Sequence, residues 1–288
     1  MSQTVLITGS STGFGRDTAE TLSKEGYKIY ASMRDPAGRN NTHANVLKDQ
    51  GINVIELDVT KAASIENAVN IIEEEEGQLD ILINNAGVAA AGISEAFTDK
   101  QVQELFDVNV LGVHRTTRAV LPLMRKQKTG LIINIGSILG RVTFPFFGLY
   151  GASKFAIEAL TEGLRYELSQ SGIEVSLLQP SAYPTQMYGS AISPEDLERA
   201  EGYGEIGKIP AAMFDQFMEI FQSTESPNPH DVAETILNII NAPAGNRPLR
   251  TVVGSSFGAE KVNEATDPIQ RQCLEGLGLG FLDTVKLD

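Results

Sequence analysis

Short segments that are apolar throughout alternate with segments of helical periodicity along the first two-thirds of the chain. The apolar runs predict strands at residues 5–7, 29–33, 54–57, 79–83, 131–135 and 175–178, with a last strand at 249–253. Apolar residues spaced at i, i+3, i+4 and i+7 predict helices at 16–25, around 65–72, and at 98–128, 149–169, 210–221 and 231–241. Because the strand segments do not alternate with polar residues, we expect parallel strands that are buried on both faces.

The order of these segments predicts the architecture. Strands separated by helices indicate βαβ units, and right-handed crossovers then build an open α/β sheet with helices on both faces. We expect one domain over residues 1–288. The pattern weakens after Pro180, where five prolines and scattered aromatic residues predict a lid at about 183–229 over the carboxyl edge of the sheet. A C-terminal extension at about 255–288 is amphipathic only in part.

Composition argues against several classes of protein. The net charge of −14 is unfavourable for a nucleic-acid surface, which needs a dense stripe of cations. No stretch approaches the ~20 apolar residues of a membrane span, and the N-terminus has no secretory pattern. Cys273 is the single cysteine, so we expect no intrachain disulfide and no Cys/His cluster for a metal. These features predict a cytoplasmic protein without nucleic-acid, membrane or metal partners.

A glycine-rich turn joins the first strand to the first helix. In the pattern G-x3-G-x-G, it contains Gly9, Ser11, Thr12, Gly13, Phe14 and Gly15. Glycines permit a tight turn and a close backbone approach to a phosphate. The helix N-terminus offers N–H groups and a partial positive charge, and the two hydroxyls add further donors. The strand before the turn and the helix after it favour nucleotide binding over a merely flexible turn.

The end of the second strand decides between two dinucleotides. An acidic residue there would bond the ribose 2′-hydroxyl of NAD, whereas an arginine would accept the 2′-phosphate of NADP. Met33 occupies the strand end, Arg34 follows it, and Asp35 lies twenty residues after Gly15. We favour Arg34 as a phosphate clamp and NADP(H) as the cofactor, with NAD(H) bound through Asp35 as the alternative. Without a cofactor, the same residues would form a solvated turn.

Three polar residues form a candidate catalytic group. Tyr150 and Lys154 share a helix face because they are four residues apart, and Ser137 lies just past the fifth strand. A tyrosine ionises near ~10 in water, and a neighbouring ammonium lowers this pKa because it favours the phenolate. Tyr150 is therefore a candidate proton donor and acceptor, and Ser137 a candidate donor to a substrate oxygen. Taken alone, the Tyr-x3-Lys spacing also fits a packed tyrosine beside an extended lysine.

Five motifs occur together in the order found in one known family. They are Thr8-Gly9-x3-Gly13-x-Gly15, Asn84-Asn85-Ala86-Gly87, Asn109, Ser137 and Tyr150-x3-Lys154. Over roughly residues 3–185 the chain resembles the short-chain dehydrogenase/reductase family, and segment 30–35 looks like its NADP-linked steroid and retinol dehydrogenases. The resemblance implies a single Rossmann-type, doubly wound sheet and hydride transfer between a nicotinamide and a carbonyl compound or alcohol.

The resemblance also implies roles for individual residues. Tyr150 is the general acid in reduction and the base in oxidation, Lys154 lowers its pKa and holds the nicotinamide ribose, and Ser137 orients the substrate oxygen. Asn109 supports a water that relays protons to Lys154. Cofactor contacts are implied for Asp58 and Val59 at the adenine, for Asn85, Ala86 and Gly87 at the sheet edge, and for Pro180, Tyr183 and Thr185 after the sixth strand. Ser181 departs from the family pattern, which has a glycine after the proline.

Aromatic and apolar residues dominate the loops at the predicted carboxyl edge. The candidates for a substrate pocket are Leu139, Phe144, Phe147, Met187 and Phe214. They predict a hydrophobic ketone or aldehyde as substrate, and they also fit lid packing or a subunit contact. The family implies a homodimer, or a tetramer, formed through the helices at 98–128 and 149–169. The alternative to an enzyme is an NADP-binding regulator, which we would expect to lack Tyr150 or Lys154.

Overall fold

A computed structural model describes residues 2–287, and Met1 and Asp288, which the predicted single domain includes, lie outside the described residues. Seven strands form one sheet in the order β3-β2-β1-β4-β5-β6-β7, and every neighbouring pair is parallel. The strands are β1 Thr4–Ile7, β2 Lys28–Met33, β3 Asn53–Glu56, β4 Ile81–Asn84, β5 Gly130–Ile135, β6 Ile173–Pro180 and β7 Arg250–Val253. The predicted open parallel sheet is therefore confirmed.

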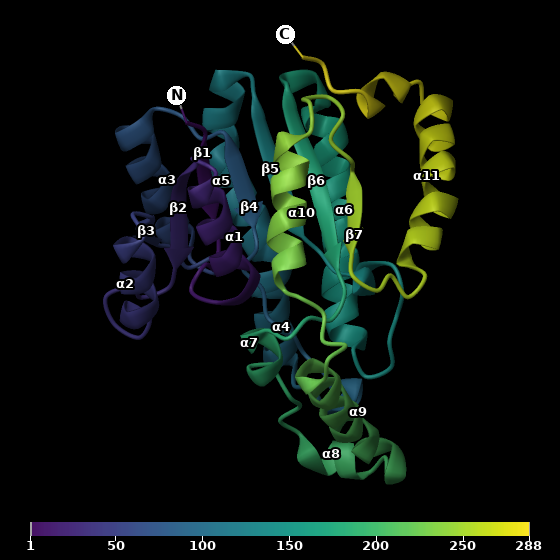
Figure 1. Cartoon of the computed structure of the whole chain (residues 1–288). Coiled ribbons are helices and arrows are strands. Elements are labelled where there is room, and N and C mark those ends of the chain that lie inside the picture. Colours follow the sequence, from purple (N-terminus) through teal and green to yellow (C-terminus); the bar gives the residue numbers. More distant parts are fainter. Residues whose placement is uncertain (1, 288) are drawn as a thin grey trace.

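Helices cover both faces of this sheet (Figure 1). One layer consists of α1 Gly13–Lys24, α2 Asn41–Asp49 and α10 His230–Asn241, and the other of α3 Ala62–Glu76, α5 Gly112–Gln127 and α6 Gly148–Leu168. The remaining helices are α4 Asp99–Phe106, α7 Gln186–Gly189, α8 Leu197–Glu201, α9 Glu205–Gln222 and α11 Ala259–Gly276. The last of these lies beside β7 at the edge of the sheet (Figure 1).

The central strands β1 and β4 are mostly apolar and fully buried because both of their faces are covered. Val5 and Ile7 of β1 pack into the layer that contains α1 and α10, while Leu6 between them packs into the layer that contains α3 and α5. All three side chains are fully buried. Burial of apolar surface contributes about 25 cal/mol per Å², so both layers stabilise the same short strands.

Several helical segments differ from the expectation. Helices α7 and α8 were not predicted, and α9 begins at Glu205, five residues before the predicted start at 210. The predicted helix at 98–128 is interrupted, because Asp107–Leu111 form a π-helical turn between α4 and α5. Helix α2 was not predicted, since only Ala44 and Leu47 of its nine residues are buried and its asparagines and threonine are weak helix formers. Helix α11 occupies part of the extension for which no helix was expected.

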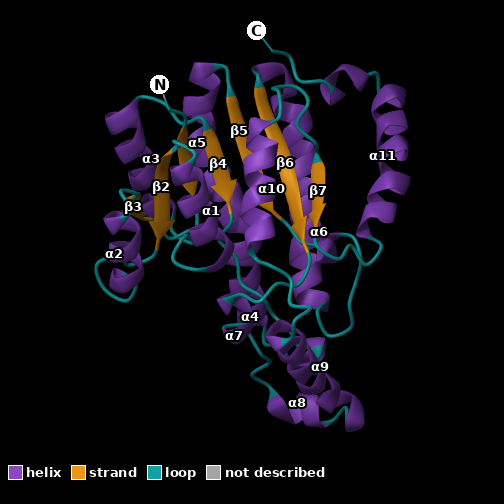
Figure 2. Cartoon of the chain, viewed as in Figure 1, coloured by secondary structure: helices purple, strands orange, loops and turns teal. Residues whose placement is uncertain are grey.

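The carboxyl ends of the strands face the segments that follow β6. In Figure 2 the strand arrowheads point toward the end of the molecule that holds α4, α7, α8 and α9. Strands β2 and β3 lie on one side of β1, and β4 and the strands after it lie on the other side. The direction in which strands are added therefore reverses between β1 and β4. Ligands of open parallel sheets bind outside the carboxyl ends at such a reversal, which places the candidate site below β1, β4 and β5.

Candidate active site

The glycine turn after β1 is held against the loop after β4. Gly9 has a φ of 70°, and a Cβ there would lie 2.9 Å from the Cα of Ala86. The Asn85 side-chain amide donates to the carbonyls of Thr8 at 2.8 Å and Gly9 at 3.0 Å. Helix α1 begins at Gly13, and no side-chain hydrogen bond caps its N-terminus. Its first N–H groups therefore remain available to a phosphate.

A cavity of about 470 Å³ opens at this turn. Of the predicted cofactor residues, its lining includes Gly9, Ser11, Thr12, Gly13, Phe14, Met33, Arg34, Asp58, Val59, Asn85, Ala86, Gly87 and Thr185. Gly15 lies behind the lining, where a Cβ would meet the Asn85 amide at 2.3 Å. The lining also contains Arg39, Asn40 and His43, which sequence reasoning did not single out. Because Arg39 and His43 are basic and lie within ten residues of Arg34, the sequence could have indicated them as phosphate-binding candidates.

The end of β2 places its two charged residues differently. Arg34 lines the cavity, whereas the Asp35 carboxylate accepts the backbone N–H groups of Gly38 at 3.0 Å and Arg39 at 2.9 Å. Asp35 is thereby folded into a local turn, with a φ of 47°. Burial alone would raise the pKa of Asp58, but its hydrogen bonds from Thr60 and the charge of Arg34 outweigh burial and lower it.

Ser137, Tyr150 and Lys154 meet at the wall of a second cavity. Ser137 begins the turn after β5, where its Oγ accepts from the N–H of Leu139 at 3.1 Å and donates to the carbonyl of Pro180 at 3.5 Å. Lys154 donates from Nζ to the carbonyl of Ile135 at 2.9 Å, and this nitrogen lies 5.6 Å from the centre of the Tyr150 ring. All three side chains are buried, with 6–8% of each residue exposed.

Burial controls the protonation of this group. It raises the pKa of Tyr150 to about 12, and the Ser137 hydroxyl only partly offsets the effect. Burial also lowers the pKa of Lys154 to about 8. The expected lowering of the tyrosine pKa by Lys154 is therefore not found: burial is the dominant cause, and the lowering contribution comes from the Ser137 hydroxyl. At neutral pH the phenol keeps its proton.

Asn109 lies behind the catalytic group, at the centre of the π-helical turn. Its Oδ1 accepts from the N–H of Val88 and its Nδ2 donates to the carbonyl of Val88, both at 2.9 Å. Nδ2 also donates to the hydroxyl of Ser153 at 3.1 Å. These bonds clamp the loop after β4 to α6. Between this clamp and Lys154 lies Gly87, at which a Cβ would be 3.4 Å from Asn109 Oδ1 and 4.0 Å from Lys154 Nζ.

The second cavity, of about 230 Å³, is lined mostly by apolar and aromatic side chains. The predicted residues Leu139, Phe144, Phe147 and Met187 line it, as do Pro180 and Tyr183. Phe214 does not, because only the last turns of α9 reach the cavity and Phe214, which is 40% exposed, precedes them. In its place Phe217 and Phe221 contact Tyr188, and Phe217 contacts Phe147, with ring centres 5.1 to 6.3 Å apart. Phe221 follows Phe217 by four residues, a spacing that marks the inner face of this helix.

Ser181 stands where the family pattern has a glycine, and Gly254 leaves space for its side chain. The N–H of Ser181 donates to the carbonyl of Val253 at 2.9 Å. A Cβ on Gly254, whose φ is 81°, would lie 2.3 Å from the Ser181 hydroxyl. The space that Gly254 leaves open therefore admits the serine side chain while the backbone stays paired with β7.

Residues 2–287 contain neither a candidate membrane span nor a candidate metal centre. In that part of the chain no helix is long and apolar enough to span a bilayer. No three His, Cys, Asp or Glu side chains of these residues gather where they could hold a metal ion.

Known proteins match this chain over most of its length. The family model for short chain dehydrogenases matches residues 3–196. A 3-ketodihydrosphingosine reductase of Bacteroides thetaiotaomicron is 35% identical over 254 residues, which cover 88% of each chain. Retinol dehydrogenase 8 of Bos taurus is 32% identical over 275 residues, which cover 92% of this chain and 86% of its own.

Solved structures share the fold at similar levels of identity. A short-chain dehydrogenase from Streptomyces avermitilis has a TM-score of 0.78 at 27% identity and covers 97% of this chain and 98% of its own. A relative from Burkholderia phymatum in complex with NAD has a TM-score of 0.74 at 26% identity, over 93% and 95%. One from Sphingobium yanoikuyae in complex with NADPH has a TM-score of 0.70 at 27% identity, over 93% and 94%.

Proposed function

Because this chain belongs to the short-chain dehydrogenase/reductase family of oxidoreductases, we propose that it transfers a hydride between NADP(H) and a hydrophobic ketone, aldehyde or secondary alcohol. One observation carries the proposal: Ser137, Tyr150 and Lys154 converge on an apolar cavity that adjoins the glycine-turn cavity. The two cavities share four residues in their linings, which are Phe14, Asn85, Thr185 and Met187. A substrate beside Tyr150 would therefore border a dinucleotide at the turn.

The glycine-turn cavity fits a dinucleotide. The uncapped start of α1, with Ser11 and Thr12, would hold the pyrophosphate. Asp58 and Val59 would contact the adenine, and Thr185 would border the nicotinamide. When bound, the nicotinamide supplies or accepts the hydride. The glycine at position 9 supports this fit, because any side chain there would collide with the Ala86 backbone.

In this proposal Tyr150 moves the proton that accompanies the hydride. In reduction its phenol donates to the substrate oxygen, and in oxidation its phenolate accepts from the substrate hydroxyl. The pKa of about 12 suits the acid role, since the phenol is protonated at neutral pH. Ser137 orients the substrate oxygen, and the charge of Lys154 stabilises the phenolate left after proton transfer.

The test of this function is Tyr150→Phe. We expect kcat for ketone reduction to fall by about 10²- to 10⁴-fold, the range for loss of a positioned general acid. Binding of NADPH, followed by its fluorescence, should stay within about twofold because the turn at Gly9 is unchanged. Full activity in the folded variant would remove Tyr150 from the mechanism. An inactive wild type that still binds NADPH would favour a regulator on the same fold.

The choice of NADP(H) over NAD(H) rests on Arg34 and its neighbours. Arg34 and Arg39 both line the cavity, whereas the Asp35 carboxylate is engaged with backbone N–H groups. This arrangement supports a cationic site for a 2′-phosphate rather than an acceptor for a ribose hydroxyl.

Removal of the Arg34 side chain should weaken the binding of NADPH more than the binding of NADH. Arg34→Ala is expected to raise the Kd of NADPH by ~10- to 100-fold, as for a lost charge-assisted hydrogen bond, with NADH nearly unchanged. The control Arg118→Ala, at an exposed position of α5, should change neither Kd. Isothermal titration with both cofactors measures the effect. Equal weakening of both would contradict a phosphate clamp at Arg34.

The lining of the second cavity supports an apolar substrate. Phe147, Tyr188, Phe217 and Phe221 form a contiguous aromatic wall beside Tyr150, and such walls bind by burial of apolar surface. Two relatives are named for 3-ketodihydrosphingosine and for retinol. We propose that α7, α8 and α9 act as a lid over this substrate.

We also propose a homodimer formed through α5 and α6. Leu111, which precedes α5, and Phe155 of α6 are 46% and 43% exposed. Exposed large apolar side chains on neighbouring helices favour association with a second copy.

A further inference from the structure

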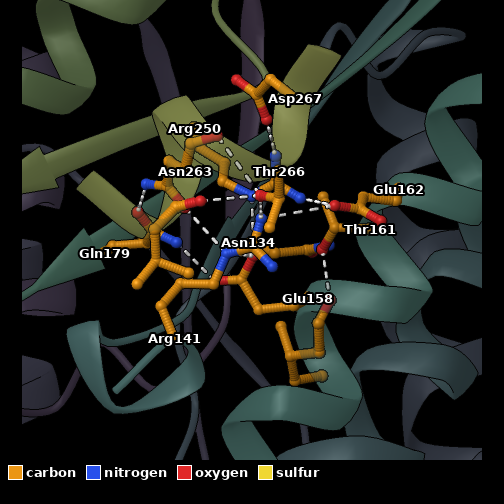
Figure 3. A network of polar contacts seen from close by, with 12 residues as sticks. Asn134, Arg141, Glu158, Thr161, Glu162, Gln179, Arg250, Asn263, Thr266 and Asp267 are labelled. Carbon is orange, nitrogen blue, oxygen red and sulfur yellow. Dashed lines mark hydrogen bonds and ion pairs between the residues drawn. The ribbon is translucent and has the colours of Figure 1, made fainter. Parts of the chain in front are cut away.

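A closed ring of side chains joins four separate segments of the fold (Figure 3). Glu158 Oε1 accepts from Gln179 Nε2 at 2.5 Å, and Gln179 Oε1 accepts from Asn263 Nδ2 at 2.7 Å. Asn263 Oδ1 in turn accepts from Arg141 Nε at 2.7 Å, and this nitrogen lies 3.5 Å from Glu158 Oε2. Each amide is thus oriented by both of its neighbours.

The ring is buried and electrically constrained. Glu158, Gln179 and Asn263 are 4%, 0% and 8% exposed. Arg250 Nε donates to Glu158 Oε2 at 2.8 Å, and the same guanidinium contacts Glu162 and, at 2.9 Å, Asp267. A buried carboxylate is costly unless its oxygens are paired. The loss of any one partner therefore leaves a donor or acceptor unpaired, and the ring favours one arrangement of its four segments.

Three of the four ring residues lie next to parts of the catalytic group. Arg141 follows the turn Ile138–Gly140, which begins at Ser137. Glu158 is one helical turn beyond Lys154 on α6. Gln179 precedes Pro180, whose carbonyl accepts from Ser137 Oγ. The ring therefore ties the serine turn to the helix that carries Tyr150 and Lys154.

The fourth segment is the C-terminal helix. Asn263 lies on α11, beyond residues 3–196 matched by the family model. We propose that Glu158, Gln179 and Asn263 are positioning residues that hold Ser137 in place relative to Tyr150. This inference rests on the proposed function. Helix α11 is then part of the support of the active site and not a passive extension.

The ring can be tested by exchanging two of its members. In Glu158→Gln an amide nitrogen faces either the Gln179 amide nitrogen or Arg250 Nε, and in Gln179→Glu two carboxylates face each other. The double variant Glu158→Gln/Gln179→Glu restores complementary partners: the amide at 158 donates to the carboxylate at 179, which still accepts from Asn263. The amide oxygen at 158 still accepts from Arg250.

We expect each single variant to lower kcat by ~10- to 100-fold, the loss typical of a small misplacement of reacting groups. The KM for NADPH should stay within about twofold, and the double variant should recover kcat to within a few-fold of wild type. Asn263→Leu should lower kcat as the single variants do. The control Lys261→Ala, exposed on the same helix, should leave kcat unchanged.

Hydrogen exchange of backbone amides 139–142 provides a readout that does not depend on activity. These amides should exchange about tenfold faster in the folded single variants and regain protection in the double variant. Unchanged exchange in the single variants, or a double variant no better than either single one, would overturn the positioning role. A wild type without reductase activity would instead overturn only the proposed function, since the exchange data would still decide the role of the ring.

Discussion

At the scale of a single residue, Lys154 lowers the stability of the fold while it serves the proposed activity. Its ammonium is buried, and among the described residues no carboxylate lies within ion-pair distance of Nζ. Its pKa of about 8, against an ordinary value of 10.5, corresponds to a cost of about 3 kcal/mol for keeping the charge in the folded state. Such costs are common at functional sites.

Lys154→Met should therefore stabilise the fold while it abolishes activity. We expect the free energy of unfolding at pH 7 to rise by about 1–3 kcal/mol. The unfolded chain holds the lysine proton more tightly, so wild type gains stability as pH rises from about 8 toward 10.5, and the difference should shrink over that window. Urea titrations at several pH values measure it, with exposed Lys261→Met as control. A destabilised variant at pH 7 would contradict the burial cost.

Lys154 and Tyr150 also show which properties of single residues the sequence could predict. The spacing of Tyr150 and Lys154 indicated that they share a helix face, and their closeness follows from helical geometry. The direction of the tyrosine pKa could not be predicted, because burial depends on β5, α6 and the lid packing around the pair. The turn of Asp35 likewise depends on backbone N–H groups that a sequence does not orient.

At the scale of elements, the contact between the serine turn and α6 governs the site. A Cβ on Gly140 would lie 3.0 Å from the Lys154 carbonyl oxygen and 3.0 Å from Glu158 Cγ. Gly140→Ala should thus force the turn away from α6. We expect it to cost about 1–3 kcal/mol of stability and to lower kcat.

The matched control is Gly163→Ala, on the same helix α6. A Cβ there meets nothing within 4 Å, and replacement of a helical glycine by alanine gains about 0.5–1 kcal/mol. Chemical denaturation should therefore move in opposite directions for the two variants. Equal effects would show that the close approach at Gly140 does not matter.

Elements with strong periodicity were predicted, and irregular or sparsely apolar ones were not. All seven strands were recognised because each contains a short run of apolar residues, which in the central strands reflects burial on both faces. The π-helical turn at Asp107–Leu111 was missed because one wide turn barely changes apolar spacing over a long helical pattern. Phe214 was assigned to the pocket because composition marks a lid, but only the structure shows which turns of α9 reach the cavity.

At the scale of the molecule, the reversal of strand order brings the two cavities together. The turns after β1, β4 and β5 end at the same edge, so the glycine turn, Asn85 and Ser137 become neighbours although they are far apart in sequence. The alternation of strands and helices predicted that these turns lie at the carboxyl edge, and the resemblance to a doubly wound sheet implied a reversal of strand order. The ring of Arg141, Glu158, Gln179 and Asn263 was not predictable, because its members are scattered over more than a hundred residues without a local pattern.

The most direct test of the account is transfer of a label to an apolar ketone from NADPH in which both hydrogens at C4 of the nicotinamide are deuterium. We expect mass spectrometry to find deuterium on the carbinol carbon of the product with wild type. The labelled product should form faster with NADPH than with equally labelled NADH, and about 10²- to 10⁴-fold more slowly with Tyr150→Phe. Transfer by the Tyr150→Phe variant at the wild-type rate, or an alcohol product without deuterium, would contradict hydride transfer from NADPH assisted by Tyr150.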